Sequence, residues 1–240
     1  MVQAAYSAGK PALGVGPGNV PCYIEKTCDV ERACTDLMLS KTFDNGMICA
    51  SEQAAIVDRE IKDQFEKYMK ENNCYFLNPE ETEKVTNFVI NREKMAVNAP
   101  VVGKPASWIA EQAGVKVPEK TKILIAPLPY PSKEFPLSLE KLSPVLAYFV
   151  CDSTEQGFEY ANTMLELGGL GHSAVIHTGN PELAEKYGVT NTAIAVAWLT
   201  RHPADMQVIL GTTKPSRVRE AARGSELPLT RQEWYGLYQA

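Results

Sequence analysis

Short apolar segments alternate with amphipathic helical segments along most of the chain, and this alternation restricts the possible folds more than any other feature. Predicted strands occupy residues 12–15, 21–24, 53–57, 122–126, 146–151 and 173–177. Predicted helices occupy residues 29–44, 60–71, 80–90, 106–113 and 153–167. Strands separated by helices favour a mainly parallel sheet with helical crossovers. The predicted fold class is therefore α/β.

Local signals mark the ends of several of these elements. Asp29 is a suitable N-cap for the first helix, and Asp44-Asn45-Gly46 is a strong stop signal for it. Ser153-Thr154-Glu155-Gln156 has the capping-box pattern. The proline-rich stretch 126–136 is expected to be an irregular loop, since proline donates no ladder hydrogen bond.

The composition is that of a folded protein without nucleic-acid or membrane partners. Hydrophobic residues make up 45% of the chain and charged residues 22%, which is enough to bury a core. The formal net charge of −5 argues against phosphate-backbone binding, which needs a basic surface. No apolar run approaches the ~20 residues of a membrane span, and the first residues do not resemble a secretory signal. We expect a soluble, cytoplasmic protein.

Six cysteines are expected to be free thiols, because nothing in the sequence points to an oxidising compartment. There is no Cys-x-x-Cys and no histidine close to a cysteine, so no metal site is predicted. Cys49 differs from the others because it follows a polar turn and precedes small residues, between a helix and a strand. Such a loop gives a nucleophilic thiol the exposure that it needs. The alternative is that Cys49 is a buried small apolar residue.

Residues 40–53 resemble the nucleophile loop of CoA-acylating aldehyde dehydrogenases. Their sequence is Ser40-Lys41-Thr42-Phe43-Asp44-Asn45-Gly46-Met47-Ile48-Cys49-Ala50-Ser51-Glu52-Gln53. It is most similar to the aldehyde dehydrogenase half of bifunctional aldehyde–alcohol dehydrogenases. Residues 9–21, 140–144 and 168–173 resemble the same family, in the family's order and near its spacing. The resemblance covers residues 1–180 and implies an aldehyde-dehydrogenase-like catalytic domain.

This resemblance implies a reaction in which an aldehyde, NAD and coenzyme A give an acyl-CoA and NADH, reversibly. Cys49 would attack the carbonyl carbon and carry the acyl group as a thioester. Glu140 aligns with the glutamate that contacts the nicotinamide ribose; otherwise it is a solvated residue of a lysine-rich loop. His172 aligns with a histidine of the acylating site, where it would accept the CoA proton or hold the thioester carbonyl; otherwise it is structural.

One departure from the hydrolytic aldehyde dehydrogenases also resembles the acylating branch. Those enzymes carry a glutamate that activates water, whereas Gly14-Val15-Gly16-Pro17-Gly18-Asn19 has no carboxylate at that place. The family's NAD-binding domain precedes the matched segment, and the chain contains no Gly-x-Gly-x-x-Gly that would hold a pyrophosphate. We therefore expect the catalytic domain to lack its N-terminal NAD-binding domain.

The C-terminal segment, residues 181–240, resembles another family. Residues 187–203, 207–217 and 233–235 are similar to the end of an aldo/keto reductase, a (β/α)₈ barrel of which only the last two units would be present. The resemblance would place four residues around the 2′-phosphate of NADP, namely Gly211, Thr212, Lys214 and Arg217. A plain packing module is the alternative. Open strand edges of a partial barrel favour self-association.

Three hypotheses follow. The first is an acylating acetaldehyde dehydrogenase segment with Cys49 as nucleophile and a small aldehyde or acyl-CoA as substrate. The second is a catalytically incomplete fusion or truncation product that keeps the fold and the thiol without turnover. The third is a relative of the aldo/keto reductases that binds NADP.

Overall fold

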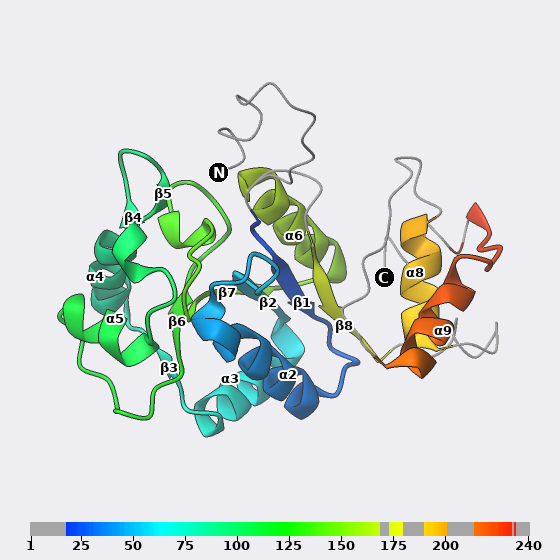
Figure 1. Ribbon diagram of the computed structural model, residues 1–240, viewed down its shortest axis with the longest axis horizontal. Coiled ribbons are helices and arrows are strands. Elements are labelled where there is room, and N and C mark those ends of the chain that lie inside the picture. The colour runs from blue at the N-terminus through cyan, green and yellow to red at the C-terminus, as the bar shows by residue number, and fades with distance from the viewer. Residues whose placement is uncertain (1–17, 169–172, 180–189, 201–213, 232, 234–240) are drawn as a thin grey trace. The chain divides into compact units, whose positions relative to one another are not determined.

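A computed structural model describes residues 18–168, 173–179, 190–200, 214–231 and 233 (Figure 1). The chain divides into two compact units, Met1–Thr178 and Gly179–Ala240. Among the predicted strands, the one at 12–15 lies outside the described residues. In the described part, no helix is long and apolar enough to cross a bilayer.

The larger unit is built on a six-stranded sheet in the order β3-β6-β7-β2-β1-β8. Its strands are β1 (Pro21–Ile24), β2 (Ala54–Asp58), β3 (Cys74–Phe76), β6 (Ile123–Pro127), β7 (Val145–Cys151) and β8 (Val175–His177). Every pairing in this sheet is parallel. The predicted mainly parallel α/β class is confirmed. All strands consequently have their amino ends at one edge and their carboxyl ends at the other.

Helices cover both faces of the sheet. They are α2 (Val30–Thr42), α3 (Lys62–Glu71), α4 (Pro79–Val89), α5 (Ala106–Gln112) and α6 (Thr154–Gly168). Short 3₁₀ turns occupy Phe43–Gly46, Arg59–Ile61, Ala99–Val101 and Pro136–Ser138, and a small antiparallel pair joins β4 (Ile90–Asn91) to β5 (Ala96–Val97). The sequence did not predict β3 or the β4–β5 pair, because three-residue and two-residue strands carry too little periodicity.

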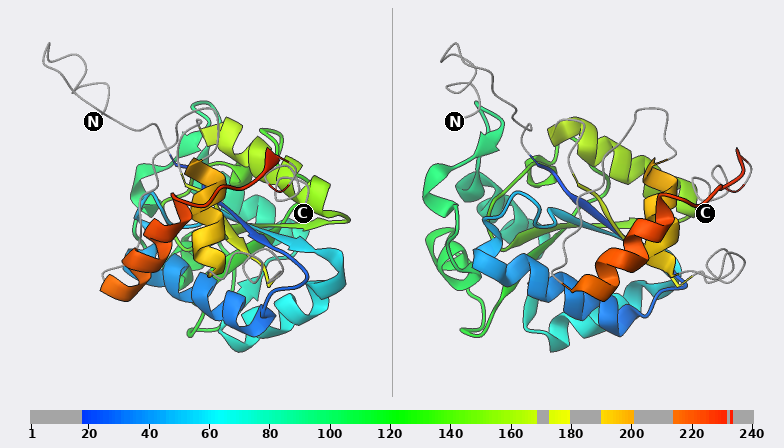
Figure 2. Two further views of the ribbon diagram at one scale, coloured as in Figure 1. Left: turned by 90° about the vertical axis from the view of Figure 1, so that its right-hand side faces the viewer. Right: turned by 45° about the vertical axis from the view of Figure 1, so that its right-hand side comes forward.

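Period-two alternation along the strands divides the core between the two faces. Cys22 and Ile24 of β1 pack with α2 and α3, whereas Tyr23 packs with α6 on the opposite face. Figure 2 shows α2 and α3 on one side of the strands and α6 on the other. A third cluster packs α4 and α5 against β6. Both faces are therefore covered, as expected for parallel strands.

The predicted helix starts match the observed caps. Asp29 Oδ1 accepts the Arg32 N–H at 3.1 Å before α2. Ser153 Oγ accepts the Gln156 N–H at 3.3 Å before α6, while Gln156 Oε1 accepts the Asp152 N–H at 2.7 Å. These bonds satisfy backbone donors that the first turn of a helix leaves free.

In the smaller unit, the structure describes α8 (Asn191–Thr200) and α9 (Pro215–Gly224). The helices meet through small residues. A Cβ on Gly224 would lie 2.2 Å from the Ala193 oxygen and 2.7 Å from the Val196 Cβ. Glycine is thus required where α9 approaches α8 most closely.

Candidate active site at the amino ends of the strands

The loop that carries Cys49 begins with an abrupt reversal of the backbone after α2. Asp44 and Asn45 each have φ of 49° and Gly46 has φ of 68°, so three successive residues are left-handed. Asp, Asn and Gly tolerate this conformation better than other residues. The stop signal seen in the sequence therefore ends the helix and turns the chain toward β2.

Two contacts hold this loop, one with the segment that precedes β7 and one with the turn that precedes α5. A Cβ on Gly46 would lie 2.9 Å from the Ser143 oxygen and 3.1 Å from the Lys41 oxygen, so only glycine allows this approach. Asn45 Nδ2 donates to the Gly103 oxygen at 3.0 Å. The loop is therefore held from both sides.

Cys49 is exposed, and its thiol is free. The alternative in which it is a buried apolar residue is wrong. The other five cysteines are buried or half-buried, and desolvation raises the pKa of each thiol: Cys22, Cys28, Cys34, Cys74 and Cys151. Cys49 is thus the cysteine placed to react with a molecule from solvent.

A hollow of about 300 Å³ borders the loop that carries Cys49, although the Cys49 side chain is not part of its lining. Both chain neighbours of Cys49 line it, together with side chains from the end of α2: Leu39, Ser40, Phe43, Ile48, Ala50 and Ser51. Leu39 is 58% exposed and Phe43 65% exposed. The lining of this hollow is therefore largely apolar, which suits a short aliphatic chain more than a charged one.

Glu140 lies in the loop before β7, at the same edge of the sheet as Cys49. It is half-buried, and its Oε1 accepts the Gly18 N–H at 3.2 Å. Desolvation raises the pKa of its carboxyl, against the opposing effects of Gly18, Lys141 and Lys41. The alternative in which Glu140 is simply a solvated residue is wrong.

Gln53 and Lys141 join the two loops, and the sequence analysis did not identify either of them. Gln53 Nε2 donates to the Ser51 oxygen, and its Oε1 accepts the Lys141 N–H, both at 2.9 Å. Lys141 is fully buried and its Nζ donates to the oxygens of Leu137 and Leu139, each at 2.6 Å. The loop with Glu140 is thereby fixed relative to the loop with Cys49.

Several buried polar atoms at this edge have no hydrogen-bond partner in the part of the chain that the structure describes. They are Asn19 Oδ1, Lys41 Nζ, Ser51 Oγ and Ser143 Oγ. Each belongs to a segment next to the amino end of β1, β2 or β7, or to the end of α2. Such a concentration requires an explanation, because buried polar groups are normally paired.

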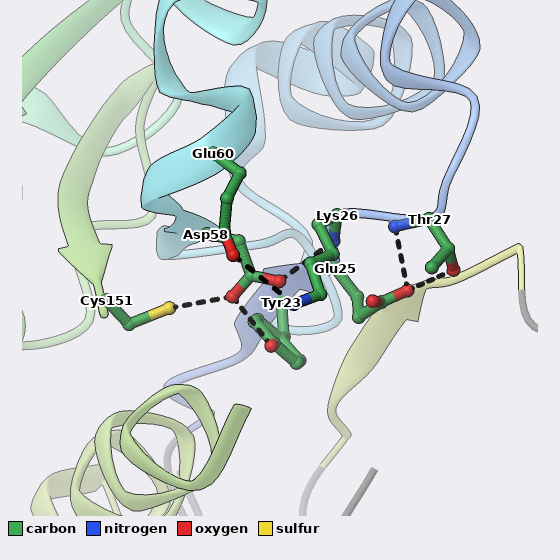
Figure 3. Close-up of polar contacts among 7 residues, drawn as sticks. All are labelled: Tyr23, Glu25, Lys26, Thr27, Asp58, Glu60 and Cys151. Carbon is green, nitrogen blue, oxygen red and sulfur yellow. Dashed lines mark hydrogen bonds and ion pairs between the residues drawn. The ribbon is translucent and has the colours of Figure 1, made fainter. Parts of the chain in front are cut away.

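The carboxyl ends of the same strands are built differently (Figure 3). Buried Asp58, at the end of β2, accepts from Tyr23 Oη and the Lys26 N–H at 2.8 Å each and from Cys151 Sγ at 3.2 Å. Glu25 accepts from the N–H and hydroxyl of Thr27 beside it. Each of the two carboxylates is thus paired with donors from neighbouring residues.

Comparisons with known proteins agree with this arrangement. Over 203 residues, the chain is 50% identical to the aldehyde-alcohol dehydrogenase of Streptococcus pneumoniae TIGR4, covering 82% of this chain and 23% of that protein. An acetylating aldehyde dehydrogenase from Geobacillus thermoglucosidasius superposes with a TM-score of 0.72 and 46% identity, over 78% of this chain and 41% of that one. The larger unit is homologous to acylating aldehyde dehydrogenases.

A third protein similar to the larger unit is the propionaldehyde dehydrogenase of Rhodopseudomonas palustris, solved with bound CoA and an acylated cysteine. It superposes with a TM-score of 0.67 and 26% identity, over 77% of this chain and 41% of that one. The chain thus spans about a quarter of the bifunctional relative and less than half of the solved ones. His172, the other residue predicted at this site, lies outside the described residues.

The smaller unit matches a different family, the aldo/keto reductase family, over residues 180–239. Of the four residues predicted to contact NADP, Gly211 and Thr212 lie outside the described residues. Lys214 and Arg217 are exposed at the start of α9. Their role in binding a nucleotide stays a prediction.

Proposed function

We propose that the larger unit carries the acyl-transfer centre of a CoA-acylating aldehyde dehydrogenase that acts on short aldehydes such as acetaldehyde. The observation that carries the proposal is the exposed Cys49 thiol, in a loop that borders an apolar hollow and lies at the same edge as Glu140. A homologue with bound CoA and an acylated cysteine supports the same chemistry. We place the activity in the cytoplasm.

In this mechanism, the Cys49 thiolate adds to the aldehyde carbonyl carbon and gives a hemithioacetal. Its collapse releases a hydride and leaves a thioester on Cys49. NAD, when bound, accepts that hydride. The thiol of CoA then attacks the thioester, acyl-CoA leaves, and Cys49 is regenerated. The proton of the CoA thiol passes to His172 or to solvent, which accounts for the one proton released per turnover.

Glu140 fits the nicotinamide end of the cofactor. Among the described residues, the Gly18 N–H is the donor to its carboxylate, and a carboxylate can accept about four hydrogen bonds. Capacity remains for two adjacent ribose hydroxyls, which would orient the ring toward Cys49. The given sequence contains no Gly-x-Gly-x-x-Gly pattern that would hold the pyrophosphate. We therefore assign to these residues the ribose contact alone.

In terms of domains, we propose that residues 1–180 are an aldehyde dehydrogenase catalytic domain, and that 181–240 derive from an aldo/keto reductase barrel. The exposed apolar side chains around the hollow support self-association. A sedimentation measurement would test that association.

The test is NADH formation by the full chain with acetaldehyde, NAD and CoA. Turnover that disappears in Cys49→Ser and persists in Cys28→Ser supports the enzyme. Absence of turnover, with Cys49 still alkylating, supports the catalytically incomplete alternative. For the smaller unit, the test is whether NADP protects Lys214 from chemical acetylation. Protection would favour nucleotide binding by this unit, and lack of protection would exclude nucleotide binding at Lys214.

A further inference from the structure

Gln53 is a fully buried glutamine that lies directly before β2. Its backbone N–H and oxygen and both polar atoms of its side chain all have hydrogen-bond partners. Glutamine is usually an exposed residue, because a buried amide is costly unless it is hydrogen-bonded. The amide at this position is therefore explained by the contacts that it makes.

The backbone of Gln53 is held by the sheet. Its N–H donates to the Val20 oxygen at 2.7 Å, and its oxygen accepts the Ala147 N–H at 3.1 Å. These bonds continue the parallel ladders of β2 with β1 and β7. Val20 is also close in sequence to Gly18, whose N–H donates to the Glu140 carboxylate. The side chain of Gln53 thus extends from a rigid support, which positions groups more accurately than a loop does.

The side-chain amide of Gln53 connects that support to both loops of the candidate site. Nε2 donates at 2.9 Å to the oxygen of Ser51, which follows Cys49 closely in the chain. Oε1 accepts at 2.9 Å from the N–H of Lys141, the residue after Glu140. One planar group therefore spans the loop with the thiol and the loop with the carboxylate, as donor to one and acceptor from the other.

The segment with Cys49 has a second support, in which Gln53 takes no part. Asn45 Nδ2 donates to the Gly103 oxygen, and the Gly103 N–H donates to the Leu142 oxygen, both at 3.0 Å. This second support would remain after loss of the Gln53 amide. We therefore expect such a loss to displace the segment without unfolding it.

We propose that Gln53 is a positioning residue that sets the place of the Glu140 carboxylate relative to the Cys49 thiol. The inference rests on the proposed function, in which the C–H bond of the hemithioacetal breaks and its electron pair leaves with the hydrogen as a hydride to bound NAD. That transfer needs close alignment, and a displacement of about 1 Å can cost about a hundredfold in rate. Alkylation of the thiol has no such requirement, so Gln53 should affect hydride transfer alone.

The first experiment compares two rates in the full chain with Gln53→Met, which keeps the size of the side chain and removes its amide. NADH formation from acetaldehyde, NAD and CoA should have a kcat lowered by about tenfold to a hundredfold. Alkylation of Cys49 by iodoacetamide, followed by peptide mass spectrometry, should stay within about twofold of wild type. An unchanged kcat, or an equal loss in both rates, would overturn the positioning role.

Gln53→Glu supplies a reversible test within one variant. The protonated acid can donate to the Ser51 oxygen and accept from the Lys141 N–H, as the amide does, whereas the carboxylate can only accept. Burial raises the pKa of a carboxyl from about 4.3 to as high as about 9, so kcat is measured from about pH 5 to about pH 9. The ratio of kcat to that of wild type at the same pH should be near one at low pH and should fall about tenfold or more as the acid ionises.

Gln156→Glu is the matched control, because Gln156 Oε1 also accepts a backbone N–H, from Asp152 at the opposite edge. Its ratio to wild type should be independent of pH. A merely structural loss in Gln53→Glu would also give a ratio without a transition. A pH-independent ratio for Gln53→Glu would therefore refute the positioning role.

A measurement without turnover separates this role from the proposed function. A nitroxide is attached to Cys49 in Cys28→Ser, because Cys28 is half-buried and the remaining cysteines are buried. Broadening of the Lys141 amide signal in NMR then reports the distance between the two loops. In Gln53→Glu, broadening should match wild type at low pH and change as the acid ionises; constant broadening would overturn the inference. A wild-type chain that forms no NADH would instead overturn the proposed function.

Discussion

The two ends of the parallel strands differ in how completely their buried polar groups are satisfied. At the carboxyl ends, Asp58 accepts from three donors. At the amino ends, Lys41, Ser51 and Ser143 each keep a buried polar atom without a partner in the described part of the chain. Ligands of open parallel sheets usually bind at the carboxyl ends, but here the unsatisfied and exposed groups are at the amino ends. Our proposal therefore places the site at the amino ends, where the unsatisfied buried groups lie, and not where the general rule would place it.

The largest effect is expected for Cys49→Ser at the amino edge. A serine hydroxyl is a far weaker nucleophile at neutral pH, so turnover should fall about a thousandfold or more. Because Cys49 is exposed, the free energy of unfolding should change by less than about 0.5 kcal/mol. NADH formation and urea denaturation measure the two quantities. A large loss of stability would mean that this edge is structural too.

At the carboxyl edge, Asp58→Ala should lower the stability of the chain and leave the reactivity of Cys49 unchanged. It removes the acceptor of three donors, two of them on Tyr23 and Cys151, and should lower the free energy of unfolding by about 3 kcal/mol. Urea denaturation measures this loss. The pH profile of Cys49 alkylation should stay that of wild type under native conditions. A shifted profile would show that the two edges are coupled.

Lys41→Met should stabilise the chain, because it removes a buried amino group without a hydrogen-bond partner in the described part of the chain. With a pKa of about 7 when folded and 10.5 when unfolded, the unfolded state binds more protons between these values. Lys41 therefore lowers the free energy of unfolding by an amount that grows as the pH falls from about 10.5 to 7. Below pH 7 that amount stays constant. The variant should gain about 2 kcal/mol at pH 7 and nothing near pH 11. Urea denaturation at both pH values tests this; an equal gain at both would contradict it.

The smallest effect is expected for Glu140→Gln, which keeps the shape of the side chain but removes its charge. Weaker hydrogen bonds to the ribose should raise the KM for NAD about tenfold. Glu134→Gln, at an exposed residue of the preceding loop, should leave it unchanged. A KM unaffected by Glu140→Gln would remove this residue from the cofactor contact.

Most of the sheet and its helices could be predicted from the sequence, because caps and periodicity act locally. Asp29 and the Asp44–Gly46 turn mark both ends of α2 correctly. The candidate site was only partly predictable. Exposure of Cys49 and burial of Glu140 depend on Gly46 and Gly18 meeting distant segments, which no local pattern encodes.

Lys41 is an instructive omission. It continues the spacing of Val30, Ala33 and Leu37, the buried face of α2, so the helical period already placed it in the core. A lysine in the last turn of a helix is common, because its positive charge interacts favourably with the helix dipole. The residue type alone therefore did not indicate that Lys41 is buried. The three-residue strand β3 carried no comparable signal.

The bond from Lys141 to Gln53 spans 88 residues of sequence. While the protein is being synthesised, Cys49 leaves the ribosome long before the segment that braces its loop exists. Closing so long a stretch of chain costs conformational entropy, so we expect this contact to form late in folding. The loop with Glu140 should accordingly become fixed relative to the loop with Cys49 only after β7 inserts between β6 and β2.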